Sequence, residues 1–355
     1  MAENSGHDAA DPAPAAGSAP RGWAERIAAR SGWFAVSLGL LLVGATLLNA
    51  RWAGNLAAVV DLDAPLGLAR GFRFQLVQIA LISLTIWARF HETATSRQQL
   101  AELRPFLDLR DEEVRALLGS FLDRTRPVQS CVGGALFGSA VVIVTLQMAN
   151  VASTESPWNA INSWSLVVNA TLFALLAFNA DQSLRAGQFF SALGRNHLRI
   201  RLLDPTRLQP FARRGLTGAQ FWFIGSALAV LLVISGSTPW VIASIIVGTV
   251  AFGVVSLLIP TVGVHQQLRE RKRRELARIR ALIEARSAAL LDGAATSASD
   301  SQLPALLAYE ARIDNVREWP FDTSNLLRFA LFLLIPLGSW LGGALVERLV
   351  DAALP

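Results

Sequence analysis

Residues 131–149 read CVGGALFGSAVVIVTLQMA, and residues 240–264 read WVIASIIVGTVAFGVVSLLIPTVGV. Neither stretch contains a charged side chain, and each is long enough to cross a hydrocarbon layer of about 30 Å as an α-helix. Neither alternates apolar and polar residues with the two-residue period of a barrel strand. Because a bilayer core leaves no water to pair the backbone, such stretches become helices. The two segments predict an all-α, polytopic membrane protein.

The remaining composition fits the same class. Of 355 residues, 52% are hydrophobic and 17% are charged, and the mean hydropathy is +0.40. Soluble domains carry roughly 25% charged residues. A single cysteine, Cys131, excludes a disulfide scaffold. Seven membrane-spanning helices are predicted, at about residues 33–50, 73–87, 131–149, 164–180, 220–235, 240–264 and 327–345. The second is the weakest, because Gln75 and Gln78 interrupt it.

The basic residues predict the orientation. If the N-terminus is cytoplasmic, only four of the 32 Lys and Arg residues fall on the outer side: Arg51, Arg70, Arg73 and Arg348. Lys and Arg near spans are retained on the cytoplasmic side, which predicts N-in and C-out. The chain is therefore expected in a cell membrane, with most of its soluble mass in the cytoplasm. Lys272 is the only lysine, and this arginine bias suggests a bacterial inner membrane.

The predicted organisation has four parts. Residues 1–32 form a disordered tail and juxtamembrane segment, residues 33–264 a bundle of six helices, residues 265–321 a cytoplasmic helical hairpin, and residues 322–355 the last span with a short outer tail. Within the bundle, the cytoplasmic loops at about 91–127 and 181–218 are expected to be helical. In the first loop, Asp111 is a candidate N-cap. An amphipathic stripe follows it, made of Val114, Leu117, Leu118, Phe121 and Leu122.

The hairpin is predicted from two apolar seams. The first seam consists of Leu276, Ile279, Ile283 and Leu290, and the second of Leu306, Tyr309, Ile313 and Val316. The small and polar residues 292–301 between them favour a turn. The two seams would bury each other as an antiparallel pair, unless a second copy or a partner protein takes one of them.

Two basic clusters border the spans. One covers residues 269–274, and the other consists of Arg195, Arg199, Arg201, Arg207, Arg213 and Arg214. Both are expected to fix the topology and to face anionic lipid headgroups. Neither has interleaved aromatic residues or a nucleic-acid-binding motif, so no nucleic-acid partner is expected.

Few residues suggest chemistry. His91, His197 and His265 all fall on the predicted cytoplasmic side and are weak candidates for a metal or haem site. They lack local ligand spacing, and no catalytic motif or other cofactor signature is present. The sequence therefore favours a protein that is not an enzyme and holds no cofactor.

Small and polar residues inside the spans suggest contacts or a pathway. Gly134 with Gly138, and Gly338 with Gly342, form GxxxG pairs suited to close helix packing within or between copies. Candidate pore or interhelix polar residues are Gln147, Asn169 and Thr171. The leading hypothesis is a scaffold or signalling protein that acts through its cytoplasmic helices. The alternative is a homo-oligomeric channel or facilitator that prefers anions.

Overall fold

The computed structural model describes residues 21–54, 59–60, 68–123, 127–150, 160–199, 202–204, 208–233, 239–291, 297–321 and 324–335, together with residues 338, 342 and 345. In this part of the chain the fold is all-helical, as predicted, and β pairing is limited to two isolated bridges. The main helices are α1 (Arg21–Trp52), α2 (Arg70–Leu103), α3 (Asp111–Asp123), α4 (Pro127–Asn150), α5 (Ala160–Asn196), α6 (Gln209–Val233), α7 (Pro239–Leu291) and α8 (Ser297–Asp314).

Prolines mark where several helices begin. Pro127 is the first residue of α4, Pro239 is the first residue of α7, and Pro210 is the second residue of α6. Proline is well placed in a first turn, because its fixed φ suits the helix and its missing N–H has no partner there anyway. At the other end of α2, Pro105 lies in the short 3-10 helix η3 (Arg104–Phe106), where the long helix stops.

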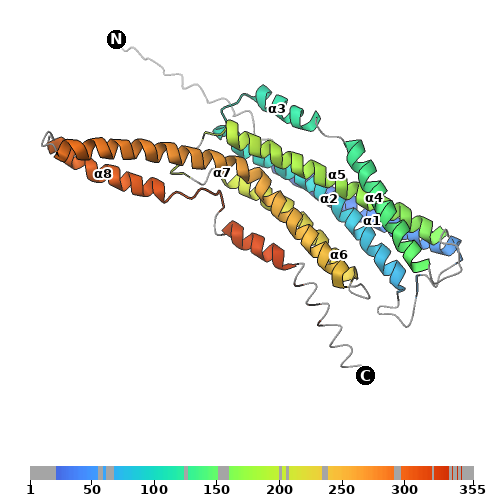
Figure 1. Ribbon diagram of the computed structural model, residues 1–355. Helices are drawn as coiled ribbons and strands as arrows, with labels where there is room; N and C mark the ends of the chain where they lie inside the picture. The colour runs from blue at the N-terminus through green and yellow to red at the C-terminus, as the bar shows by residue number, and fades with distance from the viewer. Residues whose placement is uncertain are drawn as a thin grey trace, which may run out of the picture.

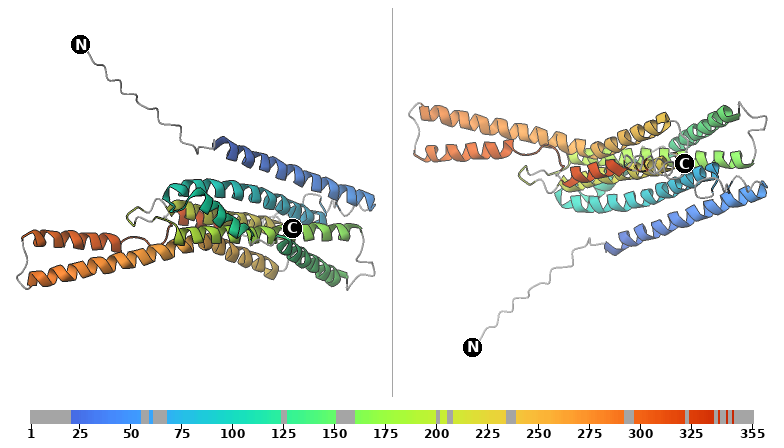
Figure 2. Two further views of the ribbon diagram at one scale, coloured as in Figure 1. Left: turned by 90° about the horizontal axis from the view of Figure 1, so that it is seen from above. Right: turned by 90° about the horizontal axis from the view of Figure 1, so that it is seen from below.

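Two long helices, α2 and α5, form the centre of the bundle. Helix α2 contacts α1, α5 and α6, whereas α5 contacts α4, α7 and α2. Figure 2 shows α1 and α4 on opposite flanks of this central pair. Ile79 and Ile82 of α2 are buried against Val168 and Leu172 of α5. The bundle is therefore held by apolar faces of α2 and α5 that point toward each other.

Five helices in the described residues are long and apolar enough to cross a membrane. They contain the segments Gly32–Trp52, Gly71–Phe106, Pro127–Val144, Ser163–Asn196 and Ile246–Ala288. The uncertain second span is among them. Helix α6, which contains most of the fifth predicted span, is not. The seventh is described as a shorter apolar helix, Ser324–Ile335, which packs against α6 and α7 through Phe329 and Phe332. Seven spans therefore stay a prediction.

The amphipathic helix α3 packs on the protein's own bundle. Val114 is buried in a cluster with Phe189 and Leu193 of α5, and Leu117 packs against the same cluster. The predicted N-cap is wrong by one residue: α3 begins at Asp111, and the backbone N–H of Arg110 donates to the Glu113 carboxylate at 2.7 Å. Asp111 instead pairs with Arg104, because that cation lies just before it at the end of α2.

A long arm projects from the bundle. Here the arm means residues 265–291 of α7 together with α8. Helix α7 passes through Pro260 without ending and curves on its way from the bundle into the arm, and α8 runs back alongside it in the opposite direction (Figure 1). Leu276 and Ile279 of α7 are buried against Ile313 of α8. The cytoplasmic location of this pair stays a prediction.

Candidate functional site

The three predicted histidines lie in separate surroundings. The His91 ring stacks on Trp87 in α2, with ring centroids 5.0 Å apart. The His265 ring stacks on Trp319 at 4.1 Å, and its Nδ1 lies 3.0 Å from the Glu318 carbonyl oxygen. His197 follows the end of α5, where its carbonyl accepts a hydrogen bond from the Asp108 N–H. Among the described residues, no three His, Cys, Asp or Glu side chains are grouped as a metal site.

The two GxxxG pairs differ in their surroundings. A Cβ added at Gly134 would lie 2.3 Å from the Phe173 carbonyl oxygen, and one at Gly138 would lie 2.8 Å from the Phe173 side chain. These glycines therefore bring α4 against α5 of the same chain. At Gly338 and Gly342 an added Cβ would meet nothing within 4 Å among the described residues.

The predicted pore residues do not share one face. Asn169 is buried where α5 meets α4, and its Nδ2 donates to the Ser165 carbonyl at 3.1 Å. Thr171 is exposed and donates to the Val167 carbonyl at 2.8 Å. Two residues along a helix correspond to a rotation of about 200°, so these side chains point to opposite sides of α5. The side chain of Gln147 lies outside the described residues. Asn169 and Thr171 thus do not line one path within this chain.

The predicted seams occupy the inside of the arm unevenly. Leu276, Ile279 and Ile313 are buried, Ile283 is partly buried against them, and Tyr309 stays 37% exposed. The remaining seam residues are the half-buried Leu306 and Val316, and Leu290, whose side chain lies outside the described residues. The arm is therefore tightest near its base.

Many of the clustered basic side chains have carboxylate partners. Arg199 pairs with Asp108 at 2.5 Å, Arg213 with Glu102 at 3.0 Å, and Arg274 with Glu270. Arg214 departs from the prediction most clearly, because its side chain is only 2% exposed. Arg214 therefore does not lie on the surface with the exposed arginines of this cluster, and any anion that it binds must enter the protein.

Arg214 forms part of a charged cluster between three helices. Its Nη2 donates to Oε1 of Glu92, which joins α6 to α2, and the Glu92 side chain is itself 14% exposed. The Arg214 guanidinium also lies 6.0 Å from the centre of the Phe190 ring of α5. A buried ion pair needs close geometry and further hydrogen bonds to offset the loss of hydration. This pair is thus a costly feature placed at the junction of α2, α5 and α6.

Two further polar pairs extend the cluster along α5. Arg89 of α2 donates to Oε1 of Gln182 at 3.3 Å and lies 5.6 Å from the Phe178 ring. One turn further along, Arg185 pairs with Asp181 at 2.8 Å. The cluster therefore combines arginines from all three helices.

A cavity of about 310 Å³ opens beside these side chains. Its walls include two stripes with the spacing of one helix face. The stripe on α2 consists of Arg89, Glu92, Thr93, Ser96 and Leu100, and the stripe on α5 of Gln182, Arg185, Ala186 and Phe189. Arg97, Phe190 and Arg214 complete the lining. The volume is at the lower end of what small-molecule sites have, roughly 300–1,000 Å³.

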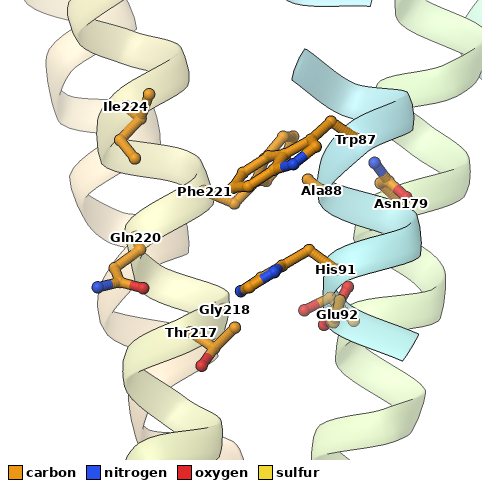
Figure 3. Close-up of a pocket in the computed structure, with 11 residues that line it drawn as sticks. Trp87, Ala88, His91, Glu92, Asn179, Thr217, Gly218, Gln220, Phe221 and Ile224 are labelled. Atoms are coloured by element: carbon orange, nitrogen blue, oxygen red, sulfur yellow. The ribbon is translucent and has the colours of Figure 1, made fainter. Parts of the chain in front are cut away.

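A smaller cavity of about 50 Å³ is also lined by Glu92 (Figure 3). His91 extends from α2 toward Gly218 and Thr217 of α6, while the Trp87 ring approaches Phe221. This space is close to that of a water molecule or two, since one water occupies about 30 Å³ of liquid volume. Of the two cavities, only the larger has room for a ligand of several atoms.

Sequence reasoning missed this cluster for an identifiable reason. The predicted second span ends at Trp87 and the fourth at Ala180, so Arg89, Glu92 and Asp181 were assigned to loops beyond the membrane. In the structure α2 and α5 continue as single helices to Leu103 and Asn196. The sequence does contain a signal for this cluster. The polar residues of the two stripes on α2 and α5 recur at helical spacing, and they continue the inward faces of the two spans.

Comparison with family models, with curated proteins and with solved structures found no match to this chain.

Proposed function

We propose that this protein is a non-enzymatic membrane scaffold or signalling protein, which presents the arm to a protein partner in the cytoplasm. The single observation that carries the proposal is the continuity of α7, which is one helix of 53 residues. Its first part packs in the apolar bundle, and its last part forms half of the arm (Figure 1). A displacement in the bundle would therefore be passed to the arm through unbroken helix.

Polar interactions hold α8 against α7 in the arm. Arg280 of α7 pairs with Glu310 of α8 at 2.7 Å. Lys272 donates to the carbonyl oxygens of Asp314 and Val316, at 2.7 and 3.1 Å, where α8 ends. Cations near the last carbonyls of a helix are stabilising, because these carbonyls have no partner within the helix. The arm is thus suited to hold a fixed surface for another protein.

The partner surface is proposed to include exposed apolar side chains beyond the seam. Leu282 of α7 is 45% exposed and Leu307 of α8 is 47% exposed. Both lie at similar height along the arm, just beyond the Arg280–Glu310 pair toward its tip, because α7 and α8 run antiparallel. Exposed leucines on a helical pair are typical anchors for a partner helix.

The accompanying topology is also proposed. Seven spans, an N-terminus in the cytoplasm and a C-terminus outside agree with the distribution of Lys and Arg. Under this topology the charged cluster lies near the cytoplasmic ends of α2 and α5, and the arm lies wholly in the cytoplasm. A bacterial inner membrane is proposed from the arginine-rich composition.

The test is site-specific photocrosslinking in living cells. A photoreactive amino acid replaces Leu282 or Leu307, and the full chain is purified under denaturing conditions after irradiation. We expect a discrete adduct with a second protein at both positions. The control places the same amino acid at Leu136 of α4, which is 66% exposed in a predicted span, and is expected to yield no protein adduct.

Two results would contradict the proposal. One is the absence of any protein adduct at Leu282 and Leu307. The other is an adduct with twice the 38.3 kDa mass of the chain and no further protein, which would favour a homo-oligomer. Ile279→Asp and Ile313→Asp, which place a charge in the buried seam, should abolish the adducts by unfolding the arm.

A further inference from the structure

The larger cavity is lined by more cations than anions. Four guanidinium groups line it: Arg89, Arg97, Arg185 and Arg214. Glu92 is the only carboxylate among the described residues that line it, and the Asp181 carboxylate pairs with Arg185. Even if both carboxylates are counted and Arg97 is left out, positive charge is in excess inside a partly enclosed space. Low-dielectric walls strengthen such a field and favour an anion.

Arg214 has unused hydrogen-bonding capacity at this cavity. Its side chain is 2% exposed and its Nη2 donates to Glu92, yet Nε and Nη1 are buried without a hydrogen-bond partner. A buried donor left unpaired destabilises the fold, and the cost is larger when the donor is charged. Native proteins rarely keep such groups without a ligand, an ion or water to accept the bonds. Arg214, which lines the cavity, therefore has two donors that lack an acceptor.

We propose that the cavity between α2, α5 and α6 binds a phosphate group, with Arg214, Arg89 and Arg185 as its main donors. A phosphate group offers several strong acceptor oxygens and up to about two negative charges. Guanidinium groups match phosphate oxygens with paired, charge-assisted hydrogen bonds. A metal ion would be repelled by the same arginines. A single carboxylate would neutralise less of the positive charge than a phosphate does.

The apolar part of the wall bears on the source of the phosphate. Leu100, Phe189 and Phe190 line the cavity beside the arginines, and a lipid that carries a phosphate monoester would place its first acyl carbons there. A soluble phosphate compound would use the arginines alone. Both sources share the chemistry recognised here. None of the described residues that line the cavity belongs to the arm, so phosphate binding and the proposed function of the arm are independent of each other.

The experiment measures binding to the full-length protein at constant ionic strength. In the first experiment, inorganic phosphate is titrated into detergent-purified protein by calorimetry, with sodium chloride as the blank. In the second experiment, binding of the protein to phosphatidylcholine vesicles is compared with binding to vesicles that also contain phosphatidic acid, whose headgroup is a phosphate monoester. We expect saturable binding in at least one of the two experiments. Binding in the first identifies a soluble source, and binding in the second alone identifies a lipid headgroup.

The variants separate the site from general surface charge. Arg214→Lys keeps the charge opposite Glu92 but removes the unpartnered nitrogens, and we expect affinity to fall about tenfold or more. Arg185→Gln is the second variant, because its side chain is 26% exposed and its loss is less disruptive to folding. The matched control is Arg213→Gln on the same helix, which is 46% exposed, pairs with Glu102 and should leave affinity unchanged.

Three results would overturn the proposal. The first is that the folded wild-type protein shows no saturable binding in either experiment. The second is unchanged affinity in both Arg214→Lys and Arg185→Gln. The third is an equal loss in Arg213→Gln, which would mean that surface charge rather than the cavity attracts the anion. Circular dichroism of each variant verifies that the helices are retained, and the crosslinking at Leu282 and Leu307 reports on the arm separately.

Discussion

At the scale of single residues, the pairing of Arg214 with Glu92 constrains how the bundle packs. The two residues are 122 positions apart in sequence, and their contact links α6 to α2. Burying either charge alone would be far more costly than burying the pair, because an uncompensated charge loses its hydration without gaining a partner. The pair therefore specifies how α2 and α6 face each other.

Removing one member of this pair should destabilise the protein strongly. We expect Arg214→Met to lower the free energy of unfolding by about 3–5 kcal/mol, since it leaves the Glu92 carboxylate buried and unpaired. The double variant Arg214→Met with Glu92→Met should recover much of the loss. Unfolding in mixed detergent, followed by circular dichroism, measures the free energy of unfolding of the wild-type protein, both single variants and the double variant, which together form a double-mutant cycle. Additive losses in the double variant would show that the two side chains are not energetically coupled.

A second residue-scale constraint is the close approach of α5 and α7 at Gly263. A Cβ at this position would lie 1.8 Å from the Ser191 carbonyl oxygen, and the Gly263 N–H donates to the Ser191 hydroxyl at 3.1 Å. We expect Gly263→Ala to destabilise the bundle by about 1–3 kcal/mol, because the helices must separate. The same detergent unfolding assay measures this loss.

The matched control for Gly263 lies on the same helix. An added Cβ at Gly248 would meet nothing within 4 Å among the described residues. Gly248→Ala should therefore leave stability unchanged or raise it by about 0.5–1 kcal/mol through helix propensity. Equal effects of the two substitutions would count against close packing at Gly263.

At the scale of elements, a short clamp joins the turn after α2 to the end of α5. The Asp108 N–H donates to the His197 carbonyl and the Arg199 N–H donates to the Phe106 carbonyl, each at 2.9 Å. Leu107 and Leu198 form an isolated β-bridge between these bonds. The clamp holds α3 where Val114 can be buried against α5.

The clamp should weaken in acid. The hydrogen bond and charge of Arg199 hold the pKa of the Asp108 carboxyl below its ordinary value. A lowered folded-state pKa means that the stabilisation is complete above the ordinary carboxyl pKa of about 4. It is lost as pH falls through the lower folded value. The effect should be small, because both side chains are exposed.

Hydrogen exchange tests this expectation. Protection of the Asp108 and Arg199 backbone N–H groups, corrected for intrinsic exchange, should decrease from pH 5 to pH 3, the range that brackets the carboxyl pKa of about 4. In Asp108→Asn the protection should be reduced already at pH 5 and should not change further. If the wild-type protein and Asp108→Asn show the same pH dependence, the ion pair does not contribute to the clamp.

At the scale of the whole molecule, the arm and the outer ends of the helices should be separated by the membrane. In a Cys131→Ser background, we expect Ala288→Cys in the arm to react with a membrane-impermeant maleimide only after cells are permeabilised. Trp52 is the last residue of α1, is 85% exposed and lies at the predicted outer end of the first span, so Trp52→Cys should react in intact cells. Reaction of Ala288→Cys in intact cells would overturn the proposed orientation.

Local sequence was sufficient for the class of fold and for much of the element order. Long uncharged stretches such as residues 131–149 require helices in a bilayer, whatever their neighbours are, because the backbone must pair within itself. Prolines at residues 127 and 239 begin helices for equally local reasons. The distinction between span and loop was less secure, since charged residues such as Arg89 and Glu92 interrupt hydropathy but not the helix.

Partners far apart in the chain required the tertiary structure. Hydropathy and spacing show which residues share a helix face, but each helix can rotate about its axis until packing against several neighbours selects one orientation. That packing places Arg214 of α6 against Glu92, brings Gly134 and Gly138 onto α5, and turns Asn169 inward while Thr171 faces outward. The cavity of about 310 Å³ exists only where α2, α5 and α6 meet, because each helix supplies part of its wall.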